Sequence, residues 1–233
     1  EDNPRYYSSF LHIIYTELLK QSNRLISEGI NLSHKFLRMR ARPKIILCQN
    51  YEEAWNYFQK YKEFILGIIS DVEFPKNGKI EPEAGIIFTK KIKAEMPDIP
   101  VLLLSQNKLF EEKALSAANS FIQKDSSLLL NELRQFMNTY FSFGDFVFKD
   151  FKGNEVGRAT NLKQLEDQLK VAPETSIRYH AERNHFSNWL KARTEFDLAH
   201  RLRPRKISDY KNVEGLRKDL IDSLNYYRTM RQR

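Results

Sequence analysis

The sequence predicts an α/β fold with a doubly wound parallel sheet, followed by a smaller α+β segment. From residue 44 onwards, short runs of consecutive apolar residues alternate with longer segments that have the period of an amphipathic helix. Uninterrupted apolar runs are typical of strands that are buried on both faces of a parallel sheet. The alternation ends near residue 142. We therefore expect one domain over residues 1–142 and a hairpin with helices, serving output or coupling, over residues 143–233.

The elements of the first domain are predicted in order along the chain. Apolar residues recur at helical spacing between Pro4 and Gly29, which predicts a long first helix, and the basic segment 31–43 connects it to the sheet. The expected strands are 44–48, 65–70, 101–105 and 120–124, and the expected helices are 51–64, 83–95, 109–118 and 126–141. The residues between 71 and 82 are expected to form a polar loop.

The second segment is predicted to begin with a β-hairpin over residues 144–159. Its turn falls near residues 152–154, and Phe146, Phe148 and Val156 are the expected inward residues. The helices that follow are expected over residues 161–171, 176–182, 185–193, 195–203 and 212–233. His180 and His185 are five residues apart, which is off the spacing that places two metal ligands on one helix face. We therefore expect these histidines to pack or to form hydrogen bonds.

The composition excludes some classes of protein. The chain has 233 residues, 41% of them hydrophobic and 29% charged, and no apolar stretch approaches the roughly 20 residues of a membrane helix. With the single cysteine Cys48, no disulfide framework can form, so we expect Cys48 to be a buried thiol in a cytoplasmic protein.

The net charge of +8 is concentrated at the C-terminal end. Residues 201–233 hold ten Lys and Arg against four Asp and Glu, which leaves +2 for the rest of the chain. Nucleic-acid binding through this tail is therefore one alternative for the function. It is disfavoured because the sequence contains no recognisable helix-turn-helix or RNA-recognition motif.

Three polar residues end the predicted strands. Asp71 follows the second strand, Ser105 ends the third and Lys124 ends the fourth. Because ligands bind at the carboxyl ends of strands in open parallel sheets, we expect these side chains to converge on one site.

These residues give the first domain a resemblance to the receiver domain of two-component response regulators. The matching motifs are DVEFP at residues 71–75, PVLLLS at 100–105, FIQK at 121–124 and the acidic start EDN at 1–3. The resemblance covers roughly residues 1–140. It implies a flavodoxin-like sheet whose first strand lies just upstream of residue 1.

The resemblance also implies a chemistry. Asp71 would accept a phosphoryl group from a histidine kinase, and Glu1, Asp2, Asp71 and the backbone carbonyl of Glu73 would hold Mg²⁺. Lys124 and Ser105 would bind the phosphate oxygens. In the switch that follows, Ser105 would move inward and the aromatic residue Phe121 would repack.

Some features depart from the receiver pattern. Asp125 follows Lys124 where the family usually has proline, and the loop over residues 76–85 is longer than usual. The segment between Asp2 and Asp71 is also longer, mainly in residues 20–43. We interpret the long first helix as a device for homodimerisation or docking.

The whole chain also resembles the regulatory N-terminal part of bacterial proteins that continue into a phosphoenolpyruvate synthase or pyruvate phosphate dikinase region. This resemblance implies an output domain that binds phosphoenolpyruvate or pyruvate. No nucleotide-binding motif of that kind lies within these residues, so we do not expect this chain to be an enzyme.

Two further alternatives remain for the site itself. A degenerate receiver would keep the fold but act as an interaction module without phosphorylation of Asp71. A phosphatase or phosphotransferase with an aspartyl nucleophile would use Glu73 as its second acid, but Pro75 stands where that class has threonine.

Overall fold

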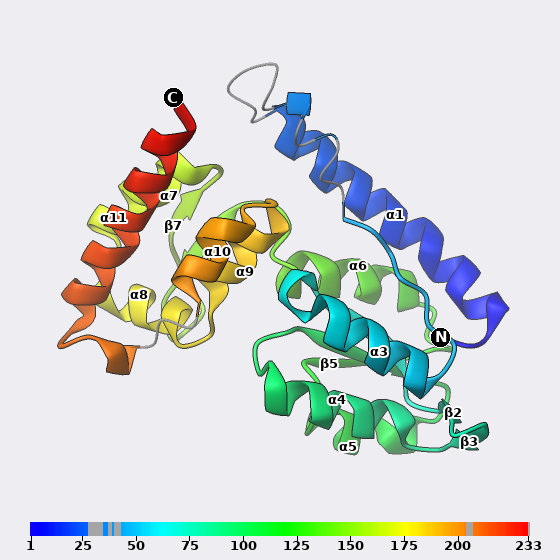
Figure 1. The fold of residues 1–233 in the computed structure, drawn as a ribbon. Coiled ribbons are helices and arrows are strands. Elements are labelled where there is room, and N and C mark those ends of the chain that lie inside the picture. The colour runs from blue at the N-terminus through cyan, green and yellow to red at the C-terminus, as the bar shows by residue number, and fades with distance from the viewer. Residues whose placement is uncertain (28–34, 37–38, 40–42, 204–206, 233) are drawn as a thin grey trace. The chain divides into compact units, whose positions relative to one another are not determined.

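Figure 1 shows the computed structural model of the chain, which describes residues 1–27, 35–36, 39, 43–203 and 207–232. The chain divides into two compact units, Glu1–Phe141 and Ser142–Arg233. In the part of the chain that is described, no helix is long and apolar enough to cross a membrane. Most of the expected basic connector, residues 31–43, lies outside the described residues.

The first unit contains a three-stranded parallel sheet with the strand order β1-β4-β5. The strands are β1 (Ile68–Asp71), β4 (Val101–Ser105) and β5 (Ser120–Gln123). Asp71 pairs with Leu104, and Ser105 pairs with Gln123, so the strands end at a common edge. Every residue of β4 is buried, as a central strand covered on both faces requires. The α/β class and the parallel sheet are confirmed, whereas the doubly wound arrangement stays a prediction.

Helices connect these strands and follow the order that the sequence predicts (Figure 1). At the start of α3, the side chain of Asn50 accepts a hydrogen bond of 2.9 Å from the N–H of Glu53, as a helix N-cap does. The helical elements are α1 (Pro4–Ser27), α3 (Tyr51–Tyr61), η1 (Lys62–Phe64), α4 (Ala84–Glu95), η2 (Lys108–Phe110), α5 (Glu111–Leu115) and α6 (Leu129–Tyr140).

The long helix α1 lies along α6 (Figure 1). Phe10, Ile13 and Leu18 are buried, and Arg134 of α6 donates a hydrogen bond of 2.9 Å to the Glu17 carboxylate. Glu1 and Asp2 precede α1 and lie at the carboxyl edge of the sheet, where Lys124 donates a hydrogen bond to Glu1 and Asp2 lies beside Asp71.

The prediction of a strand over residues 44–48 was wrong. This segment has no regular secondary structure, and Ile46 and Leu47 are exposed. An apolar run becomes a strand only where a neighbour completes its ladder of hydrogen bonds. Here the carbonyl of Cys48 accepts a bond of 3.2 Å from the main-chain nitrogen of Glu1. Cys48 is half-buried rather than fully buried, and burial raises the pKa of its thiol to about 11.

The predicted polar loop after Asp71 contains a small hairpin. Strands β2 (Phe74–Lys76) and β3 (Lys79–Glu81) pair in antiparallel fashion. Asn77 and Gly78 form the turn with φ values of 51° and 74°. An Asn-Gly pair favours this conformation, so the hairpin signal was present in the sequence but was missed.

Two apolar clusters stabilise the first unit among its described residues. The cluster that joins α3 and α4 to β2 contains the buried residues Tyr51, Phe58, Phe74, Ala84, Phe88, Ile92, Met96 and Ile99. The cluster that joins α4 and α5 to the sheet contains Val72, Ile86, Val101, Leu103 and Ala114. Each large side chain buried in this way contributes roughly 1.5–3 kcal/mol. Because Val72 directly follows Asp71, the second cluster anchors the backbone on which the site is built.

The second unit consists of a hairpin and a set of short helices. Its elements are β6 (Phe146–Lys149), β7 (Glu155–Ala159), α7 (Leu162–Val171), α8 (Glu174–Ala181), α9 (His185–Ala192), α10 (Phe196–Leu202), η3 (Ile207–Asp209) and α11 (Val213–Gln232). Phe146 and Phe148 are buried as predicted, but Val156 is exposed, so the prediction for Val156 was wrong. The core of this unit also contains Trp189 and Leu190.

Candidate functional site

Asp71 is the last residue of β1 and lies at the carboxyl edge of the sheet. Its Oδ1 accepts a hydrogen bond of 2.8 Å from the N–H of Val72. Helix α4 begins close to Asp71. The N–H of Gly85, in the first turn of α4, donates a hydrogen bond of 2.9 Å to the carbonyl oxygen of Val72. A Cβ atom at Gly85 would lie 2.0 Å from the carbonyl oxygen of Asp71. Glycine is therefore required where α4 meets the end of β1.

Lys124 connects two carboxylates that are far apart in the sequence. Its Nζ donates to Asp71 Oδ2 at 2.5 Å and to Glu1 Oε1 at 2.9 Å. The three side chains are 4%, 12% and 8% exposed for Lys124, Asp71 and Glu1. These are buried, charge-assisted hydrogen bonds, which are stronger than hydrogen bonds between neutral groups.

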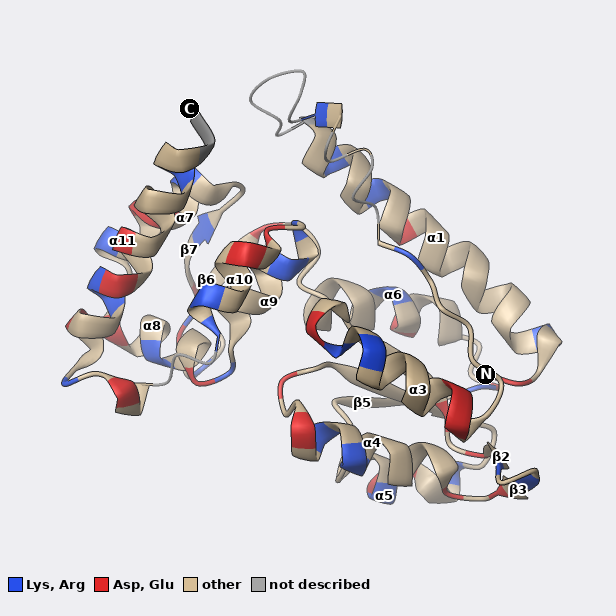
Figure 2. Ribbon diagram, viewed as in Figure 1, with Lys and Arg blue, Asp and Glu red and all other residues tan. Residues whose placement is uncertain are grey.

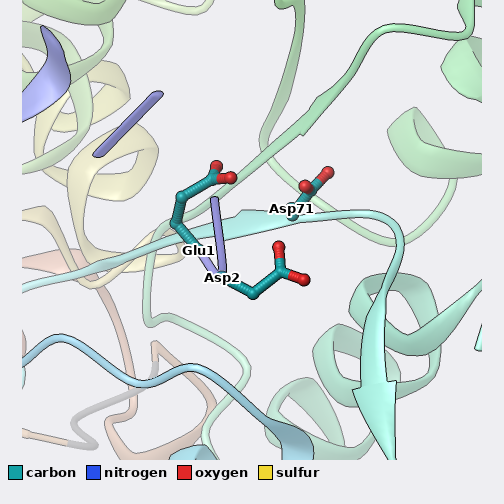
Figure 3. A group of neighbouring side chains, drawn as sticks. All are labelled: Glu1, Asp2 and Asp71. Carbon is teal, nitrogen blue, oxygen red and sulfur yellow. The ribbon is translucent and has the colours of Figure 1, made fainter. Parts of the chain in front are cut away.

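Asp2 completes an acidic triplet with Glu1 and Asp71 (Figure 3). One carboxylate oxygen from each of these residues lies within 4.8 Å of the other two. The group contains one ammonium and three carboxylates, so its formal charge is −2. A divalent cation would neutralise that charge.

The pKa values of Glu1 and Lys124 are both raised, for different reasons. Burial raises the pKa of Glu1 above its usual value, although the hydrogen bond from Lys124 opposes this effect. Burial by itself would lower the pKa of Lys124, but the nearby carboxylates of Asp71 and Glu1 outweigh it and raise the pKa. Lys124 therefore remains an ammonium group at neutral pH.

The acidic triplet fits a divalent cation such as Mg²⁺. Glu1 Oε2 is buried and accepts no hydrogen bond in the described structure, and an unsatisfied buried carboxylate oxygen is costly. Mg²⁺ holds oxygen ligands at about 2.1 Å, so that its ligands lie about 3 to 4 Å apart. The triplet oxygens lie within 4.8 Å of one another, an upper limit somewhat wider than this spacing.

Glu73 does not join this group through its side chain. It lies two residues beyond Asp71, half-buried between β1 and β2, and the acidic group found among the described residues consists of Glu1, Asp2 and Asp71. The expectation for Glu73 concerned its backbone carbonyl, and that expectation stays a prediction.

Ser105 ends β4 and is almost completely buried, with 1% exposure. Its carbonyl accepts a hydrogen bond of 2.9 Å from the N–H of Lys124, which ties the ends of β4 and β5 together. Its Oγ accepts a bond of 3.0 Å from the N–H of Asn107. The hydroxyl proton is thus available as a donor at the edge of the sheet.

Phe121 lies in the middle of β5 and is half-buried. It packs against the cluster of Val72, Val101 and Leu103. It also borders a cavity of about 320 Å³ between β5 and α6.

Sequence reasoning missed Tyr6 as a site residue. Lys124 Nζ lies 4.5 Å from the centroid of the Tyr6 ring, and the Gln106 amide donates a hydrogen bond to the Tyr6 hydroxyl. The only sequence signal was an aromatic residue four positions after Asp2. That signal is weak, because α1 contains several aromatic residues at similar positions.

The C-terminal basic tail carries charges of both signs along α11 (Figure 2). Arg217 pairs with Glu214 at 2.8 Å, and Arg228 pairs with Glu166 of α7. These ion pairs neutralise part of the positive charge that binding to a nucleic-acid backbone would need.

Comparisons of this chain with protein-family models, with curated proteins and with solved structures found no match. The chemistry of the site is therefore argued from its own geometry: an acidic triplet, a bridging lysine and a strand-end serine at the edge of a parallel sheet.

Proposed function

We propose that the first unit is a signalling module that is phosphorylated on Asp71 by a histidine kinase, in a reaction that depends on Mg²⁺. The observation that carries this proposal is the position of Lys124, which bridges Asp71 and Glu1 beside Asp2. An isolated turn-forming aspartate would need neither a buried lysine nor two further acids.

The chemistry follows from the repulsion between a carboxylate and an anionic phosphoryl donor. Bound Mg²⁺ would cancel part of this repulsion, with Glu1, Asp2 and Asp71 as its protein ligands. An oxygen of Asp71 attacks the phosphorus atom and forms the new O–P bond. The bond from phosphorus to the donor breaks, and its electron pair leaves with the donor. Lys124 then transfers the hydrogen bond that it donates to Asp71 to a phosphoryl oxygen.

Ser105 and Phe121 would convert this local event into a conformational change. The hydroxyl of Ser105 donates to a second phosphoryl oxygen, and the loop after β4 moves toward the site. Phe121 repacks into the space that this movement leaves, next to the cavity between β5 and α6. The second unit serves as the output or coupling segment in this proposal.

The proposal extends to the partners and the compartment. The phosphoryl donor is a histidine kinase in the cytoplasm, and the output is a domain that binds phosphoenolpyruvate or pyruvate. The long helix α1 serves homodimerisation or docking. These assignments depend on the resemblances of the sequence to receivers and to regulated dikinases.

Beryllofluoride with Mg²⁺ tests the proposal, because beryllofluoride mimics a phosphoryl group on a carboxylate. We expect amide NMR signals around residues 71, 105 and 124 to shift in the wild type and not in Asp71→Asn. Asp125→Asn is the matched control, since Asp125 is an exposed acid directly after Lys124, and it should respond like the wild type. A wild type that does not respond would favour the degenerate receiver.

A further inference from the structure

Lys124 is held from three sides. An ammonium group has three N–H donors, and Lys124 directs two of them to Asp71 and Glu1. The remaining side of the ammonium faces the ring of Tyr6, whose centroid is 4.5 Å from Nζ. A cation at this distance from an aromatic face is attracted to it.

Tyr6 is itself fixed by two contacts. Its ring stacks on Phe10 with 6.2 Å between the ring centroids, and Phe10 is buried. Its hydroxyl accepts a hydrogen bond from the side chain of Gln106, the residue that directly follows Ser105. The ring is therefore held from helix α1 on one side and from the loop after β4 on the other.

We propose that Tyr6 is a positioning residue, which holds the Lys124 ammonium against Asp71 and Glu1 so that it meets the incoming phosphoryl oxygen. A lysine side chain is flexible and loses rotamer entropy when it is fixed. The Tyr6 ring restricts that freedom before the reaction. This inference rests on the proposed function for its catalytic consequence, but not for the position of Lys124.

The inference predicts opposite effects on two measurements. In Tyr6→Leu, Lys124 is held less firmly on the carboxylates of Asp71 and Glu1. It then competes less with Mg²⁺ for these carboxylates, so Mg²⁺ should bind more tightly. Phosphorylation by acetyl phosphate should become slower, since Lys124 is no longer in place. We expect both changes to be on the order of fivefold. A general disruption of the site would instead weaken both.

Two variants control this experiment. Tyr6→Phe keeps the ring over Lys124 and its stacking on Phe10 but loses the hydrogen bond from Gln106, so its Mg²⁺ affinity and phosphorylation rate should lie closer to those of the wild type than those of Tyr6→Leu do. Tyr7→Leu makes the same change at the next residue, which is also half-buried, and should likewise have little effect. Tyr6→Leu values equal to those of Tyr7→Leu, or a parallel loss of binding and rate, would overturn the inference.

A measurement without metal or phosphoryl donor separates this inference from the proposed function. The Tyr6 ring should move the ¹H NMR signals of the Lys124 ε-methylene group upfield in the wild type and in Tyr6→Phe, but not in Tyr6→Leu. If these shifts occur while acetyl phosphate leaves the wild type unmodified, the positioning role stands and the phosphoacceptor proposal fails. If the wild-type signals are not shifted upfield, the positioning role is wrong.

Discussion

At the scale of single residues, the balance of charge at the carboxyl edge decides how the site behaves. Lys124 is the ammonium bonded to Glu1 and Asp71, and all three side chains are largely buried. When one partner of a buried ion pair is removed, the other charge stays buried without compensation, and this destabilises the fold. Lys124 is therefore expected to matter for stability as well as for chemistry.

Replacing Lys124 with methionine should lower the free energy of unfolding by about 3 kcal/mol at neutral pH. Mg²⁺ should restore more stability to this variant than to the wild type, because the ion replaces the missing positive charge. Urea unfolding with and without Mg²⁺ measures both effects. The control is Lys62→Met, whose pair with Glu95 lies at the surface and whose loss should change the stability far less, because solvent screens exposed ion pairs. Equal losses in the two variants would contradict this account.

The sequence was sufficient to place Asp71, Ser105 and Lys124 at the edge of the sheet, because each directly ends or follows an apolar run. It was not sufficient to find Tyr6, whose contact with Lys124 depends on the direction in which α1 leaves the site. The unsatisfied oxygen of Glu1 also required the structure, since burial of a terminal acid has no local sequence signal.

At the scale of elements, the contact between β1 and α4 determines where Asp71 lies. The helix approaches so closely that Gly85 has no room for a Cβ atom beside the carbonyl oxygen of Asp71. Any side chain at this position must push the start of α4 away from the end of β1. The position of Asp71, the proposed phosphoacceptor, therefore depends on a residue that takes no part in the proposed chemistry.

Gly85→Ala should destabilise the first unit by roughly 1–3 kcal/mol through overpacking, and it should weaken Mg²⁺ binding because Asp71 is displaced. Gly215→Ala is a matched control in α11, where the added Cβ would meet its nearest neighbour at 3.5 Å. That change should stabilise slightly, as alanine replaces glycine in a helix. Chemical unfolding and Mg²⁺ titration calorimetry test both variants. An unaffected Gly85→Ala would refute the close contact.

The elements also show where sequence patterns mislead. Residues 44–48 and 101–105 are similar apolar runs, yet only the second forms a strand, because it has strand neighbours on both sides. The pattern reports apolar character and length, but neither burial nor the presence of a pairing strand. The hairpin at Asn77 and Gly78 has a strong turn signal, but its two strands are only three residues long. Strands this short leave no apolar pattern, so the hairpin was missed.

At the scale of the whole molecule, the two units have separate cores and should respond differently to acid. In the second unit, His180 Nε2 accepts a hydrogen bond of 2.8 Å from the N–H of Lys149. The proton of neutral His180 therefore lies on Nδ1, which is 2.9 Å from Nδ1 of His185. Burial, with a smaller contribution from neighbouring charge, lowers the pKa of His180 to about 3 and that of His185 to about 4.

Because these values lie below the ordinary histidine pKa of 6.5, the unfolded second unit binds more protons than the folded one in acid. Its stability should fall as the pH drops from about 6.5 toward about 4. In a Trp55→Phe background, the fluorescence of Trp189 reports the unfolding of the second unit. In a Trp189→Phe background, the fluorescence of Trp55 reports the unfolding of the first unit. We expect His180→Gln to flatten the pH dependence of the Trp189 signal only. The same pH dependence in His180→Gln as in the wild type would show that the pair does not control it.

The central claim is that Asp71 accepts a phosphoryl group, and intact-protein mass spectrometry tests it most directly. After incubation with acetyl phosphate and Mg²⁺, we expect the wild type to gain the mass of one phosphoryl group, and hydroxylamine, which cleaves acyl phosphates, to remove it. Asp71→Asn should gain no mass under the same conditions. A wild type of unchanged mass, or an Asp71→Asn variant that gains the same mass, would contradict the account.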